Sequence, residues 1–472
     1  MLVRSTGQTL AHQLALIFAE RIRNRLLAPG ARLPSVRECA RQQGVSPHTV
    51  VAAYEQLHAQ GLVEVRQQRG FFVRDFRTQQ ADMARNAPSS PPALHTPADA
   101  STLIRSMFYR KSDKPQPGMG VLPPEWLEND FLPGALRSLT RGAAAQTFSL
   151  RYGEPAGDVL FRQSLARKLA AIDLPVKPEQ IITSVGATHA LDIVSRTLLR
   201  SGDTVMVEEP GWAIEFARLE SLGMRVLPVP RGADGPDLDV MTRYCEAGEA
   251  LRPKLFVSVS VLHNPTGYSL SPGAAHRILQ LANRYDFHIV EDDTYCHLAP
   301  AHATRLSVLD SLQRTIYVGG FAKILAPNWR VGFLAAPEAL HARLLETKLL
   351  ATLTTPALFE RALAICIDQG HLRRHCERIR VRLDMARARS VKLALAAGCH
   401  FVAEPAGLFG WVDTGVDTDA LTQRMLDADY SLAPGSLFHV QRPPSTLMRI
   451  NFASAQDATF WKTFKKMRAE IA

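Results

Sequence analysis

The sequence lacks the features that mark membrane-bound and secreted proteins. No apolar run reaches the roughly 20 residues that a membrane-spanning helix needs, and the first ten residues lack the apolar core of a secretory signal. The six cysteines include no Cys-x-x-Cys pair, which argues against a disulfide framework and against a zinc site. We therefore expect a cytoplasmic protein with reduced thiols, no membrane partner and no bound metal.

The first 77 residues contain no lysine, yet they are strongly basic. Eleven arginines face five acidic residues, a net charge of +6 in a chain whose total is +10. Such asymmetry indicates a polyanionic partner, with nucleic acid first. On charge alone, a merely solvated basic surface explains the pattern equally well.

The length of 472 residues predicts two or three domains, and we see no internal repeat. Residues 1–77 form a first zone. Residues 78–117 are polar and rich in proline, which is typical of a semi-extended linker. Residues 118–472 alternate short apolar strands with helical patterns, which predicts a parallel sheet covered by helices.

The first zone has the pattern of a helix, a helix-turn-helix and a two-stranded wing. Apolar residues recur at helical spacing over 10–26. Ser35 followed by Glu38 predicts the start of a second helix, and Ser46 before Pro47 predicts the start of a third. Residues 62–65 and 71–73 are expected to pair as strands.

This layout suits binding in the major groove, with the start of the third helix near base edges. His48 and Thr49 lie there, while Arg37, Arg41, Arg66 and Arg69 could neutralise phosphates. A small helical domain that binds protein remains the alternative.

Four segments carry a specific resemblance: 32–38, 49–57, 61–63 and 69–73. They resemble the winged helix of GntR-type regulators, and the resemblance covers residues 9–74. It implies a double-stranded DNA operator as partner. Pro47 stands where the family often has arginine, so the target sequence is open. The residues we assign to the DNA contact are Arg37, Ser46, His48, Thr49, Arg69 and Gly70.

The third zone places polar residues after successive predicted strands. Residues 181–188 read as a strand, a tight turn and a helix start that could cradle a phosphate, although many α/β proteins contain such a unit. Asn264, Asp292 and Lys323 each follow a further strand, where open α/β sheets bind ligands. Taken singly, Lys323 could be an ordinary surface lysine.

In this order, the residues suit one chemistry. A lysine amine forms a Schiff base with an aldehyde, and a carboxylate beside a pyridine ring keeps its nitrogen protonated. The zone resembles fold-type I aminotransferases that depend on pyridoxal 5′-phosphate, with a large α/β part and a smaller C-terminal α+β subdomain. The resemblance runs from about Gly118 to the end.

The resemblance implies a role for each matching residue. Lys323 would be the catalytic, aldimine-forming lysine, Asp292 would pair with the ring nitrogen, and Asn264 and Tyr295 would bind the ring hydroxyl. Trp212 would stack on the ring, although a core tryptophan is an equal alternative. Arg449 would hold the effector's carboxylate. The expected phosphate ligands are Gly186, Ala187, Thr188, Arg330 and, across a subunit boundary, Tyr152.

Two positions depart from the pattern of active aminotransferases. Relatives usually carry hydroxyl residues just before the lysine, whereas this chain has Gly320 and Ala322. Each missing hydrogen bond is worth about 1–2 kcal/mol in a charge-assisted setting. We expect the cofactor to bind, with catalytic tuning reduced; partial or half-transamination stays open.

The complete layout resembles the MocR subfamily of GntR regulators. It implies a bacterial homodimer, associated with the nucleoid when on DNA, that senses an amino compound or pyridoxal phosphate itself through an aldimine at Lys323. One alternative is an active aminotransferase with an accessory DNA-binding domain. Another is a DNA-binding protein whose large domain serves only for dimerisation.

Overall fold

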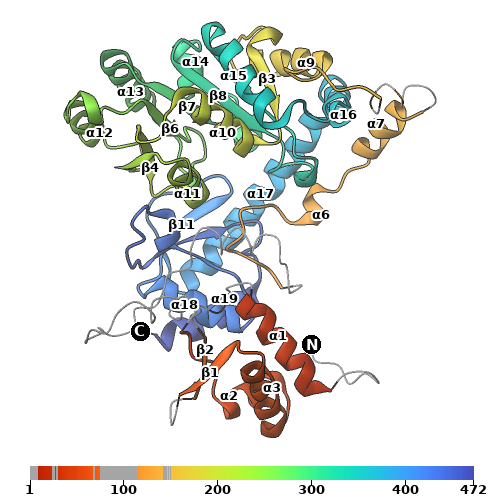
Figure 1. Ribbon diagram of the computed structural model, residues 1–472, viewed down its shortest axis with the longest axis vertical. Helices are drawn as coiled ribbons and strands as arrows, with labels where there is room; N and C mark the ends of the chain where they lie inside the picture. The colour runs from red at the N-terminus through yellow and green to blue at the C-terminus, as the bar shows by residue number, and fades with distance from the viewer. Residues whose placement is uncertain are drawn as a thin grey trace. The chain divides into compact units, whose positions relative to one another are not determined.

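The computed structural model divides the chain into two compact units, Met1–Lys111 and Ser112–Ala472 (Figure 1). Each unit is described by itself. The residues that the structure describes are 9–23, 27, 30–66, 70–74, 114–141, 146, 148 and 150–471. Within these ranges, none of the helices combines the length and the apolar character needed to span a membrane.

The first unit is a winged helix. Its elements are α1 (Leu10–Arg23), α2 (Val36–Gln43), α3 (Pro47–Ala59), β1 (Val63–Arg66) and β2 (Gly70–Val73). The hydroxyls of Ser35 and Ser46 accept hydrogen bonds from backbone N–H groups three residues on, so each serine caps the helix that follows it. Gly44, at φ 65°, ends α2 in the left-handed conformation.

Tyr54 joins the parts of this unit. Its ring packs edge-on against Phe18 of α1 and Phe71 of the wing, and its hydroxyl donates to the carbonyl of Pro34 at 3.0 Å. Leu14, Val50 and Leu57 fill the same core and are fully buried. The predicted helices and strands of this zone are present, with strand ends within one residue of the prediction, while residues 24–26 of the predicted first helix lie outside the described residues.

The second unit is built on a seven-stranded sheet in the order β3-β9-β8-β7-β6-β4-β5. Six strands run in one direction, as predicted, whereas β9 runs antiparallel to both of its neighbours. Only a short segment without an α-helix joins β8 to β9, so the chain simply reverses there. The strands are β3 (Ile181–Ser184), β4 (Thr204–Glu209), β5 (Arg225–Pro230), β6 (Leu255–Ser258), β7 (His288–Asp292), β8 (Thr315–Gly320) and β9 (Gly332–Ala335).

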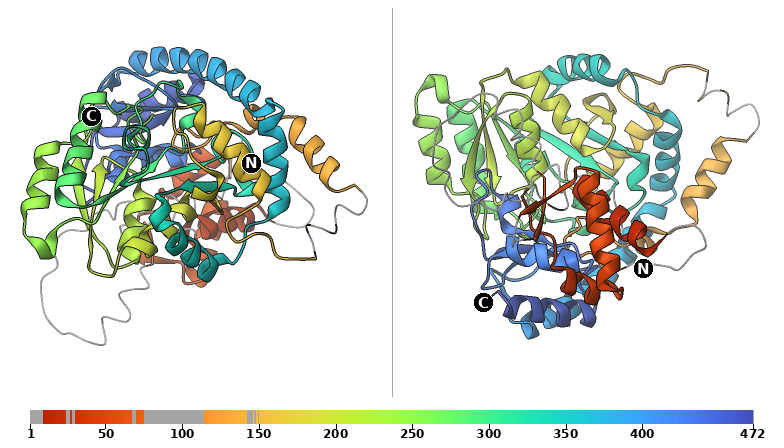
Figure 2. Two further views of the ribbon diagram at one scale, coloured as in Figure 1. Left: turned by 90° about the horizontal axis from the view of Figure 1, so that it is seen from above. Right: turned by 60° about the horizontal axis from the view of Figure 1, so that its bottom comes forward.

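Helices cover both faces of the sheet (Figures 1 and 2). One face packs on α10 (Ala187–Leu198), α11 (Ala213–Ser221) and α15 (Glu338–Thr352). The opposite face packs on α12 (Leu238–Glu246) and α13 (Pro272–Tyr285). Every strand except the edge strand β5 is almost entirely buried, as a sheet covered on both sides requires.

The C-terminal part forms a smaller subdomain, as predicted. Its four-stranded antiparallel sheet has the order β10-β11-β13-β12. The strands are β10 (His400–Phe401), β11 (Phe409–Asp413), β12 (Ala433–Pro434) and β13 (Leu447–Asn451). The remaining helices of the unit are α6 (Pro124–Leu127), α7 (Phe131–Leu139), α9 (Val159–Ala170), α14 (Leu306–Asp310), α16 (Ala357–Asp368), α17 (His371–Ala396), α18 (Thr418–Asp427) and α19 (Ala458–Ala469).

Most of the predicted linker, residues 78–113, lies outside the described residues. Three of its last four residues, Lys114, Gln116 and Pro117, are hydrogen-bonded to the small subdomain. Lys114 Nζ donates to the carbonyl of Ala428 at 2.9 Å, and Gln116 Nε2 donates to that of Asp429 at 3.1 Å. The ordered second unit therefore begins at or before Lys114.

Candidate functional site

The start of α3 is the exposed end of the helix-turn-helix. Ser46 and His48 are exposed there, as is Arg37 on α2. Thr49 is half-buried, and its hydroxyl lies 2.8 Å from that of Ser46. Because Ser46 also caps the helix, these two hydroxyls hold each other in place. The start of α3 thus presents polar side chains of the kind that contact phosphates and base edges.

The wing is described only in part. Gly70, at φ 100°, begins β2, while Arg69 lies outside the described residues. Arg66 bonds Glu64 at 2.8 Å and covers the ring of Phe72, with 4.5 Å from guanidinium carbon to ring centroid. Part of its charge is therefore offset within the wing.

A second set of predicted residues meets where β6, β7 and β8 end. Asp292 is the last residue of β7, Lys323 follows β8, and Asn264 follows β6. Arg449 comes from β13 of the small subdomain, so the pocket lies between the sheet and this subdomain. The carboxyl ends of parallel strands meet at one edge of a sheet, which explains why separate segments converge here.

Lys323 is half-buried, and its ammonium group has few partners. Nζ donates to the carbonyl of Gly120 at 2.8 Å and lies 5.7 Å from the centroid of the Tyr295 ring. Desolvation, followed by repulsion from Arg449, lowers the pKa of Lys323 to about 8, although Asp292 opposes this shift. About a tenth of the amine is therefore uncharged at pH 7 and able to attack a carbonyl, far more than for a lysine in water.

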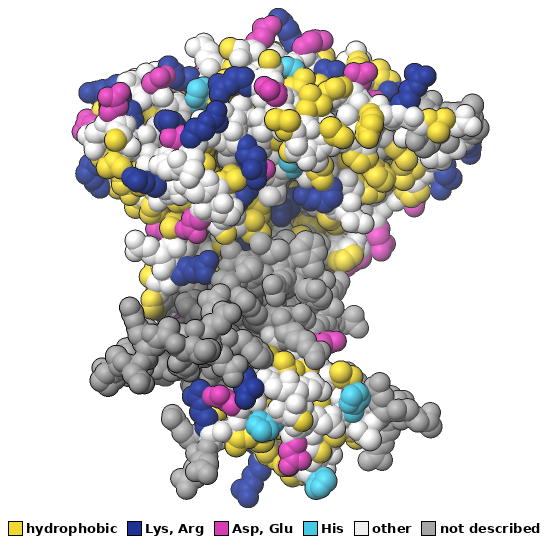
Figure 3. Space-filling view, in the orientation of Figure 1, with side chains coloured by type: hydrophobic (Ala, Val, Ile, Leu, Met, Phe, Trp, Pro, Cys, Tyr) yellow, Lys and Arg dark blue, Asp and Glu magenta, His cyan; other side chains and the backbone are white. Residues whose placement is uncertain are grey.

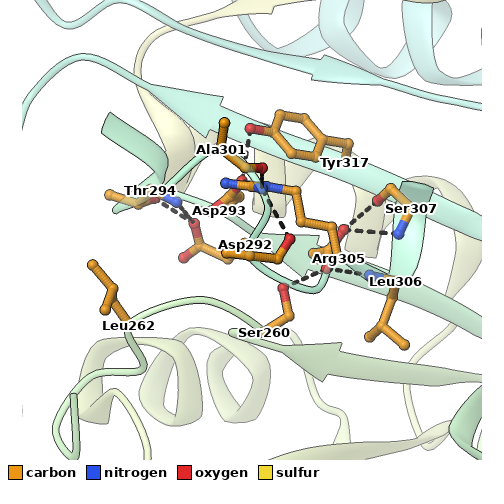
Figure 4. A network of polar contacts seen from close by, with 12 residues as sticks. Ser260, Leu262, Asp292, Asp293, Thr294, Ala301, Arg305, Leu306, Ser307 and Tyr317 are labelled. Carbon is orange, nitrogen blue, oxygen red and sulfur yellow. Dashed lines mark hydrogen bonds and ion pairs between the residues drawn. The ribbon is translucent and has the colours of Figure 1, made fainter. Parts of the chain in front are cut away.

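The turn that directly follows β7 holds the carboxylate of Asp292 in place (Figure 4). Oδ1 accepts from the backbone N–H of Thr294 at 3.1 Å and also from the Thr294 hydroxyl. Burial raises the pKa of Asp292 to about 6, against these hydrogen bonds. A cationic group placed beside it would bring this pKa down again.

Residues behind Asp292 form a separate buried network (Figure 4). Asp293 accepts from Arg305 at 2.6 Å and from the Tyr317 hydroxyl at 3.0 Å. Glu291 accepts from the backbone N–H groups of Leu306 and Ser307 at 2.7 and 2.9 Å. Both acids have their partners on the far side of the strand, so Asp292 is the acid of this run that remains for the pocket.

Arg449 is buried between two aromatic rings. Its guanidinium carbon lies 4.5 Å from the ring centroid of Phe409 and 5.0 Å from that of Phe438. Nη1 donates to Asn264 Oδ1 at 2.8 Å, and Nη2 donates to the carbonyl of Gly118 at 2.6 Å. Nε has no hydrogen-bond partner among the described residues. A buried cation with a spare donor suits an anionic ligand.

Asn264 and Tyr295 complete this side of the pocket. Asn264 is buried and joins Arg449 to Tyr295, whose pKa is raised by burial and partly lowered again by Arg449 and by a hydrogen bond with Asn264. The phenol is therefore a hydrogen-bond donor across the physiological pH range.

The turn between β3 and α10 meets the loop after Lys323. Gly186, at φ 79°, precedes the first turn of α10, which contains Ala187 and Thr188. Arg330 Nη2 donates to the carbonyl of Val185 at 3.2 Å. A Cβ at Gly332 would lie 2.5 Å from the carbonyl carbon of Gly186, so the two backbones touch. A helix N-terminus next to an exposed arginine can bind a phosphate.

Two predicted residues lie apart from this group. Tyr152 is 82% exposed, as a side chain that reaches a second subunit would be. Trp212 is half-buried at the start of α11, and it packs against the hydrophobic cluster under the sheet. This packing leaves both interpretations of Trp212 open.

Gly320, one of the two residues before Lys323 that depart from the aminotransferase pattern, has space around it for a larger side chain. Gly320 is buried, and a Cβ there would lie 3.6 Å from the backbone nitrogen of Ala187, which is ordinary contact. A serine would therefore fit. The missing hydroxyl is a chemical difference that the space around Gly320 does not require.

Sequence reasoning missed the backbone of residues 118–121. The carbonyls of Gly118 and Gly120 accept from Arg449 and Lys323, and a Cβ at Gly120 would lie 3.6–3.8 Å from both side chains. Glycines next to a proline-rich linker resemble more linker, so their pattern carried no sign of this role. The aromatic pair around Arg449 also had no local motif.

The aminotransferase class I and II family matches residues 126–462, more than half of the chain, and the gntR family of bacterial regulatory proteins matches residues 10–73. The uncharacterized HTH-type transcriptional regulator YdcR of Escherichia coli K12 is 28% identical, over 93% of this chain and 94% of the relative. The probable rhizopine catabolism regulatory protein MocR of Rhizobium meliloti is 30% identical, over 76% of this chain and 73% of the relative.

A solved structure shares the fold of the second unit. LysN, an α-aminoadipate aminotransferase from Thermus thermophilus complexed with N-(5′-phosphopyridoxyl)-L-leucine, matches with a TM-score of 0.70 at 24% identity, covering 78% of this chain and 94% of that one. Membership of the aminotransferase family implies pyridoxal 5′-phosphate as the cofactor. The chain belongs to the aminotransferase class I and II family and, through its N-terminal gntR-family winged helix, to the MocR subfamily of GntR regulators.

Proposed function

We propose that the chain is a transcriptional regulator that binds pyridoxal phosphate through Lys323 and senses an amino compound, or the cofactor itself. The observation that carries this proposal is the meeting of Lys323, Asp292 and Arg449 in one pocket of a chain that also has a winged helix. A chain that only read DNA would have no need to hold three ionisable groups in a desolvated site.

The pocket residues fit the cofactor. Asp292 would bind the protonated ring nitrogen, and Asn264 and Tyr295 the ring hydroxyl. When bound, pyridoxal phosphate supplies an aldehyde that condenses with amines and a ring that withdraws electrons. Trp212 would cover one face of the ring. The groups that would hold the phosphate are Gly186, Ala187, Thr188, Arg330 and the partner subunit's Tyr152.

The chain's own residues would then select the effector. Arg449 would bind a carboxylate through its free Nε and the neighbouring η nitrogen, and the effector's amine would take the place of the Lys323 amine. Because one group binds the carboxylate and the other site takes the amine, an effector with both groups, such as an amino acid, fits the pocket better than a simple amine. Such a ligand can change the conformation of the regulator only by the difference in its affinity for the two conformations.

A homodimer is part of this proposal. Large hydrophobic side chains are exposed on α9 and at the end of α15, with Leu350 at 85% and Leu353 at 53%. Figure 3 shows hydrophobic side chains gathered over α9 and α16. A contiguous patch of exposed hydrophobic side chains is typical of a protein–protein interface. Covering it with a second copy would also give the exposed Tyr152 a partner pocket to enter.

An active aminotransferase with an accessory DNA-binding domain is the second candidate function. The meeting of Lys323, Asp292, Asn264, Tyr295 and Arg449 favours it, because these groups serve catalysis as well as sensing. Gly320 and Ala322 weigh against it. Steady turnover of an amino acid with a 2-oxo acid would establish this second function.

The test combines a spectrum with a DNA-binding assay on the full chain. With pyridoxal phosphate, the wild type should gain an absorption band near ~420 nm, as a lysine Schiff base does, and Lys323→Ala should lack it. Lys348→Gln is the matched control, since this lysine is also desolvated but lies outside the pocket. Amino acids that change the spectrum should also change the affinity for DNA upstream of the gene. Equal spectra for wild type and Lys323→Ala would contradict the proposal.

A further inference from the structure

The longest helix of the second unit has a larger net positive charge than the whole unit. Helix α17 spans His371–Ala396 and contains seven arginines, one lysine and two acidic residues, a net charge of +6. Residues 78–472 together have a net charge of only +4, so this part of the chain is slightly acidic without α17. The positive charge is therefore concentrated on one element.

Five of these basic residues lie on one side of α17. At 3.6 residues per turn their spacings of four, four, seven and three place them in one row, and the row is about 27 Å long. All five are exposed, and α17 runs along the edge of its unit in the left view of Figure 2. We call them the α17 stripe: Arg374, Arg378, Arg382, Arg389 and Lys392.

The two acidic residues of α17 pair outside the stripe. Glu377 bonds Arg373 at 3.1 Å, and Asp384 bonds Arg387 at 2.7 Å. Among the described residues, no carboxylate lies within ion-pair distance of the stripe. Its positive charge is therefore not compensated within the part of the chain that the structure describes.

The stripe's own contacts are with neutral groups. Arg374 donates to the carbonyl of Gln369 at 3.3 Å, and Arg378 lies 3.4 Å from His375 Nδ1. Arg382 donates to the carbonyl of Glu125 at 3.4 Å and covers the Trp126 ring at 4.7 Å. Such contacts orient the guanidinium groups and leave their charge available.

The opposite side of α17 is fixed in the core through Leu372, Ile379, Leu383 and Ala386, all buried. The helix therefore cannot turn an apolar face towards a lipid surface. Among the large apolar side chains of α17, Val381, Met385 and Leu395 are exposed, which is far less apolar surface than a membrane-bound helix buries. A row of fixed cations with little apolar surface instead matches the phosphate backbone of a nucleic acid.

We infer that the α17 stripe binds the phosphate backbone of DNA beside the segment that the winged helix reads. The inference rests on the proposed DNA-binding function and extends it to the second unit. A row of about 27 Å covers roughly eight base pairs at 3.4 Å per step. The 39 residues between Arg74 and Lys114 can span more than ~100 Å when extended, so the linker allows both units to contact one duplex.

The test measures binding of the full chain to labelled DNA duplexes at 50–200 mM salt. One duplex has 15 base pairs, enough for a winged helix, and the other has 60 base pairs that include the same 15. The stripe variant combines Arg374→Gln, Arg378→Gln, Arg389→Gln and Lys392→Gln. The control removes four exposed arginines near β5 and α13 through Arg225→Gln, Arg243→Gln, Arg277→Gln and Arg284→Gln, so both variants lose the same charge.

On the 60-base-pair duplex the stripe variant should bind about 10- to 100-fold more weakly than the control at low salt. The slope of log K against log salt is negative, and the stripe variant should make it less steep by about 2 to 4, since each lost phosphate contact removes roughly 0.9. On the 15-base-pair duplex the two variants should agree. Retained cofactor absorption would show that both variants are folded.

Two results would overturn the inference. One is equal binding of the stripe and control variants to the long duplex. The other is stripe-dependent binding to phosphatidylglycerol vesicles while DNA affinity stays unchanged, which would assign the stripe to a lipid surface. Failure of the wild type to bind either duplex would instead contradict the proposed DNA-binding function itself.

Discussion

Two lysines of the second unit are desolvated, and they differ in what surrounds them. Lys323 faces Arg449 and Asp292 in the pocket, whereas Lys348 is fully buried and donates to the hydroxyls of Thr183 and Thr355 at 3.2 and 3.4 Å. Desolvation lowers the pKa of each to about 8. Under the proposed function, loss of the proton from Lys323 would serve ligand binding, whereas loss of the proton from Lys348 would affect only the stability of the fold.

The pKa of Lys323 predicts how the cofactor-free chain takes up pyridoxal phosphate. Only the uncharged amine attacks an aldehyde, so the rate of uptake should rise about tenfold per pH unit below pH 8 and level off above it. Stopped-flow absorbance between pH 6 and 9.5 would measure this profile.

Two variants should move that profile in opposite directions. Arg449→Met removes a cation that lowers the pKa of Lys323, so its midpoint should shift to higher pH. Asp292→Asn removes an anion that raises this pKa, so its midpoint should shift to lower pH. Midpoints that moved together, or stayed fixed, would show that these charges do not control the amine.

Lys348 predicts a pH dependence of stability. Its pKa of about 8 in the folded chain lies below the value near 10.4 of an unfolded chain, so only the unfolded state holds the proton between these limits. The free energy of unfolding of the wild type therefore rises with pH across that window because of Lys348. Lys348→Met should gain most over the wild type below pH 8, and this gain should shrink by about 3 kcal/mol towards pH 10.4.

Urea unfolding followed by tryptophan fluorescence at several pH values would measure this difference. Lys462→Met on α19 replaces an exposed lysine and provides the control. A gain for Lys348→Met that was independent of pH would rule out the shifted titration.

At the scale of elements, the β3–α10 turn depends on its contact with β9. Gly332→Ala places a Cβ 2.5 Å from the carbonyl carbon of Gly186, and a backbone atom cannot move aside as a side chain would. We expect at least tenfold weaker binding of pyridoxal phosphate, measured by fluorescence titration. Gly273→Ala at the start of α13 meets nothing within 4 Å and should bind like the wild type. Equal affinities would show that the turn is not needed for the phosphate.

Element positions followed from local chemistry in the sequence. Ser35 and Ser46 marked helix starts because their hydroxyls satisfy free backbone N–H groups, and Asp292 and Lys323 stood out because polar residues followed apolar strands. No local feature of the sequence predicted that β9 runs antiparallel to its neighbours. The partners of Arg449 also escaped prediction, because Phe409, Phe438 and Gly118 are distant in sequence and meet only through packing.

At the scale of the whole molecule, the exposed hydrophobic face predicts how copies assemble. Leu350→Glu places a charge on α15 where a second copy would bury a leucine, so the dimer should dissociate at least tenfold more readily. Sedimentation velocity over a concentration series would measure this. Leu251→Glu, at an exposed leucine beyond α12, should leave assembly unchanged. A wild type that is monomeric at every concentration would contradict the dimer.

Family membership of the whole chain was readable from its sequence, because each unit carries several motifs in order. The boundary between linker and second unit was less visible. Residues 114–117 have the composition of the linker, and only their hydrogen bonds to the small subdomain show that they are anchored. The composition of residues 114–117 predicts a linker, but their fixed position depends on hydrogen-bond partners more than 300 residues away in the sequence.

The anchored segment, residues 114–117, directly connects the pocket residue Arg449 to the end of the linker that leads to the winged helix. Ser431 N–H donates to Gln116 Oε1 at 2.8 Å, Asn451 Nδ2 donates to the carbonyl of Met119 at 2.9 Å, and Arg449 holds Gly118. Gly118 follows closely after Lys114, where the tether to the winged helix begins. Under the proposed function, a ligand that draws Arg449 away from Gly118 would loosen this end of the linker directly, and no movement of the central sheet would be needed.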